Sequence, residues 1–139
     1  MSAPDVQVQR AGGEGFTHNE INPDPAENRM VQLWILPEVP GEPASYHVYR
    51  PAPGAQTRVY GGPASQSDTL SAKTVLDIAQ PRVGDTVSVD GAYLAYLTKG
   101  GGVLADGRAV VDGDLIRGED LRFEARQDTQ LVLGTEVTT

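Results

Sequence analysis

The feature that most constrains the fold is a regular series of short strand-forming runs that begins after Leu70. The runs, of which AYLAYLTKG is the clearest, recur at spacings of about 8–12 residues, a rhythm typical of antiparallel sandwiches and barrels. Asp90-Gly91, Asp106-Gly107 and Asp112-Gly113 separate several of them, and Asp-Gly pairs favour tight hairpin turns. No run shows a helical period. The sequence therefore predicts an all-β fold with little helix.

The first half of the chain has a different composition, with proline-rich breaks such as NPDPAEN and PEVPGEP. Each proline fixes its own φ and restricts the residue before it, so these breaks interrupt regular structure. Short strands are predicted at Val6–Arg10, Phe16–Glu20 and Met30–Leu36, and within the run SYHVYR. The third is the most apolar run of the chain and is expected to be buried, ending at Pro37. We predict that residues 1–64 form an arm and connector, and that residues 65–139 form a complete barrel.

Charge and cysteine content exclude several classes of protein. The formal net charge is -8, without a cluster of Lys and Arg, which disfavours direct binding to nucleic acid or to an anionic membrane surface. No apolar run approaches the roughly 20 residues of a membrane span. The chain has no cysteine, so disulfides, thiol chemistry and cysteine-based zinc sites are excluded. The N-terminus lacks the layout of a secretory signal, and a cytoplasmic location is expected.

His18 and Glu20 are the candidate metal ligands. On a strand, residues two apart project from the same face, and an imidazole beside a carboxylate can bind a metal ion. Two protein ligands leave a metal ion largely hydrated and weakly held, and the chain has only one other histidine, His47. Three interpretations stay open: hydrogen-bonding residues on a sheet face, a partial metal site, or a His₂Glu₂ set completed by a second chain about a two-fold axis.

Two aromatic residues, Phe16 and Trp34, are candidates for a pocket or an interface, although aromatic side chains more often belong to a core. No residue is predicted to be catalytic. The sequence contains neither a nucleophile elbow nor a phosphate-binding loop.

A set of residues in the first half resembles the pirin family, whose members have two cupin barrels in one chain. The matching pattern is Gly-x-Gly-x-x-His-x-Glu-x-Asn-Pro followed by Gln-x-Trp-Ile-x-Pro, formed here by Gly13, Gly15, His18, Glu20, Asn22, Pro23, Gln32, Trp34, Ile35 and Pro37. The motif likeness covers about Ala11 to Arg50. From Ala72 onward it is a likeness of strand rhythm.

The resemblance implies a cupin jelly roll preceded by the remnant of a first barrel, so that the sequence corresponds to the C-terminal half of a pirin-like protein. Pirins hold a metal, usually iron, through a His-x-His pair and a His-x-Glu pair, and only the second pair matches, at His18 and Glu20. No cofactor is expected unless a second chain completes a site for iron or another divalent metal.

Two functions follow from the resemblance. The first is a non-catalytic binding or interaction module, and the alternative is a metal-dependent dioxygenase of the quercetin 2,3-dioxygenase kind. A remnant barrel has unpaired strand edges, so we expect a homodimer formed through the N-terminal arm. The sequence identifies no small-molecule ligand.

Overall fold

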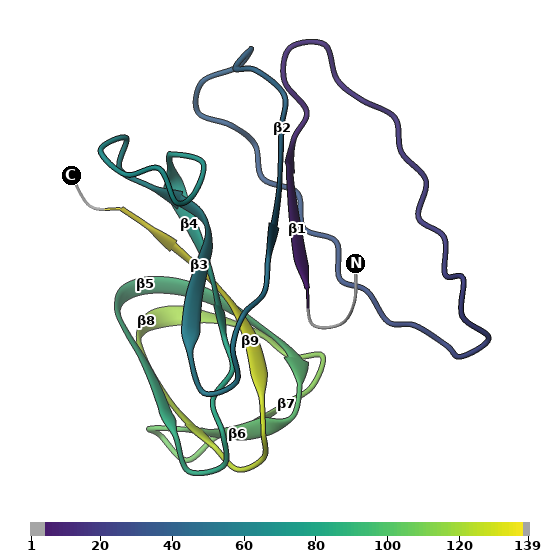
Figure 1. Cartoon of the computed structure of the whole chain (residues 1–139). Helices are drawn as coiled ribbons and strands as arrows, with labels where there is room; N and C mark the ends of the chain where they lie inside the picture. Colours follow the sequence, from purple (N-terminus) through teal and green to yellow (C-terminus); the bar gives the residue numbers. More distant parts are fainter. Residues whose placement is uncertain (1–4, 138–139) are drawn as a thin grey trace.

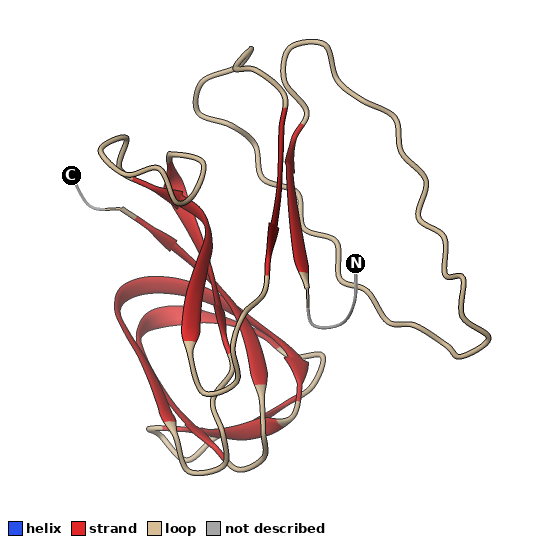
Figure 2. Ribbon diagram, viewed as in Figure 1, coloured by secondary structure: helices blue, strands red, loops and turns tan. Residues whose placement is uncertain are grey.

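The structure, a computed structural model, describes residues 5–137 and is all-β over that range (Figure 2). The strands are β1 (Val6–Arg10), β2 (Ser45–Tyr49), β3 (Gln56–Gly62), β4 (Ala72–Ala79), β5 (Thr86–Lys99), β6 (Gly101–Leu104), β7 (Ala109–Val111), β8 (Leu115–Ala125) and β9 (Gln130–Glu136). None of the described segments forms a helix that could cross a membrane. The prediction of an all-β fold is confirmed.

Seven strands form one strongly curved antiparallel sheet in the order β3-β4-β9-β5-β8-β6-β7 (Figure 1). The long strands β5 and β8 pair along most of their length and curve around the barrel together. This is a cupin-like jelly roll. The sheet begins at Gln56, before the predicted division between residues 64 and 65, because β3 is paired with β4.

The Asp-Gly pairs have two different roles. Asp106-Gly107 and Asp112-Gly113 lie in turns, as predicted. The predicted turn at Asp90-Gly91 is wrong, because β5 continues through it with a register shift between Val89 and Ala92. Gly91 adopts a φ of 79°, and its N–H donates to the Asp120 carboxylate at 2.7 Å, so the pair forms a bulge that bends β5 along β8.

The barrel interior is filled by apolar side chains. Its fully buried members include Leu97, Leu121, Phe123, Leu131 and Leu133. Packing is tight enough that Gly102 has no room for a side chain, since an added Cβ would lie 2.6 Å from Cζ of the Phe123 ring. The described interior of this barrel is therefore a packed apolar core.

β1 and β2 pair antiparallel and form a separate two-stranded sheet that packs on the outside of the barrel. We call this sheet the hairpin, although the long segment 11–44 joins its two strands. Val6, Val8 and Tyr49 from the hairpin cover a second apolar cluster on the barrel, formed by Val59, Ile78 and Val132. Strand alternation leaves Tyr46 and Val48 facing away from this contact, and both are exposed. The hairpin thus has one covered face and one open face.

The two other strands predicted in the arm are absent. Phe16–Glu20 and Met30–Leu36 have no strand pairing, and the second of them is largely exposed instead of buried. The residues of Met30–Leu36 do favour strands, but a strand forms only where a sheet edge lies alongside to pair with its backbone. Within the described part of the chain, no strand pairs with this segment.

Candidate functional site

His18 and Glu20 lie side by side in the irregular segment that follows β1. The distance from His18 Nε2 to Glu20 Oε1 is 3.6 Å, and both side chains are more than a third exposed. His18 Nδ1 is 3.3 Å from Oε1 of Gln9 on β1, and the Phe16 ring lies 5.2 Å from the imidazole. The pair is therefore held by contacts with β1 and Phe16, and not by the alternation of a strand.

These residues do not amount to a closed metal site. Among residues 5–137, no group of three or more His, Cys, Asp or Glu side chains is arranged to hold a metal ion. The other histidine, His47, lies within hydrogen-bond distance of the Ser45 hydroxyl at 2.9 Å and stacks with Tyr49. A metal ion at His18 and Glu20 would thus need further ligands from outside this group.

The two aromatic candidates have different surroundings. Phe16 lines a shallow depression of about 330 Å³ together with Gln9, Arg10, Ala44, Ser45 and Tyr46. Trp34 does not line it, and 87% of its surface is exposed. The structure therefore places Phe16 beside the hairpin and Trp34 on the outer surface of the arm.

Two polar contacts attach the arm to the barrel, and the sequence predicted neither of them. The Arg29 guanidinium donates to both carboxylate oxygens of Asp112 at 2.6 and 2.7 Å, a bidentate pair between residues 83 apart in the sequence. The hydrogen bond from Arg29 lowers the pKa of Asp112, and the same bond raises the pKa of Arg29. The Glu38 carboxylate accepts the backbone N–H groups of Lys73 and Thr74 at 3.1–3.2 Å. No local pattern in the sequence marks these long-range pairs.

Between these two contacts lies an apolar segment, residues 30–37, which we call the strap. Its exposed large side chains are Met30, Val31, Leu33, Trp34 and Leu36. Trp34 and Leu36 are 87% and 90% exposed. No hydrogen bond joins the strap's backbone to any other described residue. The strap is therefore a run of neighbouring exposed apolar side chains, the kind of surface that marks interaction sites.

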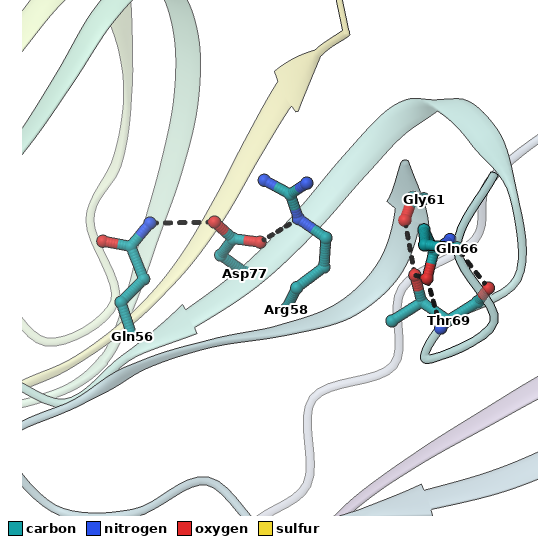
Figure 3. Close-up of polar contacts among 6 residues, drawn as sticks. All are labelled: Gln56, Arg58, Gly61, Gln66, Thr69 and Asp77. Atoms are coloured by element: carbon teal, nitrogen blue, oxygen red, sulfur yellow. Dashed lines mark hydrogen bonds and ion pairs between the residues drawn. The ribbon is translucent and has the colours of Figure 1, made fainter. Parts of the chain in front are cut away.

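A polar network organises the connection between β3 and β4 (Figure 3). The Gln66 side-chain oxygen accepts the N–H groups of Asp68 and Thr69, and the Thr69 hydroxyl donates to the Gly61 carbonyl. Beside it, the Asp77 carboxylate accepts from Arg58 Nε at 3.0 Å and from Gln56. Arg58, Gly61, Gln66, Asp68 and Thr69 line a depression of about 320 Å³. Most polar groups of the network satisfy one another, which indicates a structural role.

Comparison with known proteins supports the fold. No protein-family model matches the sequence, and no curated protein matches it. Among solved structures, the bacterial pirin YhhW from Escherichia coli in complex with nickel(II) superposes with a TM-score of 0.62 and 16% sequence identity, covering 76% of this chain and 49% of that one. A second YhhW structure from Escherichia coli gives 0.60 and 17% over the same shares.

The chain thus spans about half the length of the pirin structures it matches. At this level of identity, the likeness establishes the fold. The resemblance to pirins that the sequence motifs indicated is confirmed at the level of the fold.

Proposed function

We propose that this cupin module is a non-catalytic interaction protein that acts through its N-terminal arm. The observation that carries the proposal is the strap, whose apolar side chains face solvent between two polar attachments to the barrel. Contiguous exposed apolar surface on a folded protein marks an interaction site more often than a chance arrangement.

The barrel itself offers less support for a function in catalysis. Cupin-like barrels that enclose a ligand need free interior volume, and here the interior is occupied by large side chains such as Leu97, Leu121 and Phe123. The strap thus supports a role in protein interaction, and the filled interior argues against a reaction inside the barrel.

The partner we propose is a second copy of the chain, with the arms of two chains covering each other. The strap carries no charged residue, so its association brings no like charges into direct contact at the interface. A homodimer of this kind would remove Trp34 and Leu36 from water.

Sedimentation velocity over a series of concentrations tests this function. We expect a dimer for the wild-type protein and a monomer for a strap variant that combines Leu33→Ser, Trp34→Ser and Leu36→Ser. A matched control, Leu94→Ser with Leu115→Ser, changes exposed apolar residues of the barrel and should dimerise like wild type. A wild-type protein that stays monomeric at every concentration would contradict the proposal.

The second candidate function is a metal-dependent dioxygenase of the quercetin 2,3-dioxygenase kind. It is favoured by one observation, the 3.6 Å approach of His18 Nε2 to Glu20 Oε1. The pair would need ligands from a second chain, giving a His₂Glu₂ set. Elemental analysis of untagged protein separates the two candidates: about one iron per two chains, lost in His18→Ala, would favour the dioxygenase and overturn the non-catalytic proposal.

A further inference from the structure

The strap has the properties of a β-strand that lacks a sheet. Its sequence MVQLWILP is rich in residues that favour strands, and residues 27–37 contain neither a turn nor a bend. Figure 1 shows the arm as a long open trace beside β1 and β2. Because the strap's N–H and C=O groups have no partner among the described residues, they are available to an incoming sheet edge.

The same chain contains a sheet edge that could accept this strand. The hairpin has only two strands of five residues each, so both outer edges of the β1–β2 sheet lack a neighbour in the sheet. Two-stranded sheets are marginally stable by themselves, and open edges recruit further strands. Neither β1 nor β2 contains an acidic residue, so neither edge of this sheet would place a carboxylate against the uncharged strap.

We propose that the strap of one chain adds as a third strand to an open edge of the β1–β2 sheet in a second copy, and that the exchange is reciprocal. This inference rests on the proposed function and specifies how the two arms engage. Each chain contains both the added strand, which is the strap, and the sheet edge that receives it, and the two have similar lengths. Two chains related by a two-fold axis can therefore exchange straps at both edges at once, which closes the assembly as a dimer.

The polar attachments explain why the exchange joins two chains. Arg29 and Glu38 hold the two ends of the strap on the barrel, through Asp112 and through the N–H groups of Lys73 and Thr74. With its ends fixed there, the strap is kept extended and does not pair with its own hairpin. An extended segment that is already ordered loses less conformational entropy on binding than a disordered one.

Strand alternation predicts which side chains the exchange would cover. Leu33 and Ile35 would project from one face of the enlarged sheet, and Trp34 and Leu36 from the other. One of these rows would extend the open face of the hairpin, where Tyr46 and Val48 are exposed. The exchange would therefore satisfy backbone groups and cover apolar side chains in one step.

Hydrogen exchange at residues 31–36 provides the first test. In a monomer these N–H groups have no protein acceptor and should exchange as in an unstructured peptide, whereas in the exchanged dimer alternate N–H groups should be slowed. We expect this protection to increase with protein concentration, together with new protection in β1 or β2.

Cross-linking provides the second test. The chain has no cysteine, so the introduced cysteines are the only thiols that can form a disulfide. A Leu33→Cys chain mixed with a Gln7→Cys chain probes the β1 edge, and a mixture with Val48→Cys probes the β2 edge. Neighbouring strands bring Cβ atoms to about 4.5–5.5 Å, which allows a mixed disulfide after small adjustments. Leu33→Cys mixed with Val83→Cys, an exposed barrel position, is the matched control and should give none.

A matched pair of variants separates backbone pairing from side-chain contact. Leu33→Ala and Leu33→Pro both remove the leucine, but only proline removes an N–H and opposes a ladder. Since alternate N–H groups of the strap would bond to the edge, we expect either Leu33→Pro or Trp34→Pro to weaken the dimer about tenfold more than the alanine variant at the same position.

The outcomes distinguish this inference from the function on which it rests. A dimer whose strap N–H groups exchange as fast as in the monomer, with no mixed disulfide at either edge, would overturn strand exchange and leave association through the arm intact. If neither Leu33→Pro nor Trp34→Pro weakens the dimer more than the alanine variant at the same position, strand exchange is likewise overturned, because one of these two neighbouring N–H groups would bond to the edge. A protein that never dimerises would overturn both.

Discussion

Replacement of Trp34 by alanine should separate association from folding. Trp34 is the only tryptophan in the chain, and 87% of its surface is exposed. A tryptophan side chain can bury roughly 150–250 Å², and at about 25 cal/mol per Å² full coverage would contribute roughly 4–6 kcal/mol, an upper bound. Because the folded chain covers so little of the side chain, the free energy of unfolding of the monomer should change by less than about 0.5 kcal/mol.

The dimer should respond very differently to the same substitution. A tryptophan near the centre of an interface typically contributes about 2–4 kcal/mol, which corresponds to a dissociation constant roughly 30- to 1,000-fold weaker in Trp34→Ala. Leu115→Ala removes an exposed side chain from β8 and serves as the control, with no change expected in the dissociation constant.

Analytical ultracentrifugation gives the dissociation constants, and urea denaturation at low protein concentration gives the stability of the monomer. In wild type, Trp34 fluorescence should shift to the blue as concentration rises, since dimerisation moves the indole out of water. A Trp34→Ala dimer within about threefold of wild type would refute the reasoning. A loss of several kcal/mol in monomer stability would also refute it, because Trp34 would then belong to the core.

Three further predictions concern the barrel and its attachments. Phe123→Ala should lower the free energy of unfolding by about 3–5 kcal/mol in urea denaturation, because the ring is fully buried in the core; a loss below about 1 kcal/mol would contradict this packing. Burial is the main cause that raises the pKa of Tyr49 and Tyr60 above the ordinary 10.0, so folding favours their neutral forms. Their contribution to stability should be complete below pH 10.0 and should decline as the pH rises through the higher folded-state pKa values. Denaturation at alkaline pH measures this decline, with Tyr→Phe variants as controls. A stability that does not decline would contradict the reasoning. The bond from Arg29 lowers the pKa of Asp112 below its ordinary 3.8, so the attachment should persist at neutral pH and open only as the pH falls below 3.8. The Nη–H signals of Arg29 in NMR spectra should report this opening, and a transition near neutral pH would exclude the pair as its cause.

Local sequence patterns alone determined the character of the barrel. Apolar and polar residues alternate or cluster over strand lengths, and turn residues separate them, so the region after Leu70 can bury its apolar side chains only as paired strands. The turns at Asp106-Gly107 and Asp112-Gly113 follow from the backbone freedom of glycine and the hydrogen-bonding side chain of aspartate. The spacing of His18 and Glu20 predicted neighbouring side chains on a strand; the two do lie close together, but no strand forms there, and contacts with Gln9 and Phe16 hold them.

Tertiary structure determined the conformation of segments whose local sequence predicts another one. Asp90-Gly91 has the composition of a turn but becomes a bulge, because β8 runs alongside and Asp120 accepts the N–H of Gly91. Met30–Leu36 has the composition of a buried strand but remains an exposed strap, because a strand requires a neighbouring edge that local sequence cannot supply. Attachment of the strap depends on Arg29 meeting Asp112 from 83 positions away, a proximity that the path of the folded chain alone creates.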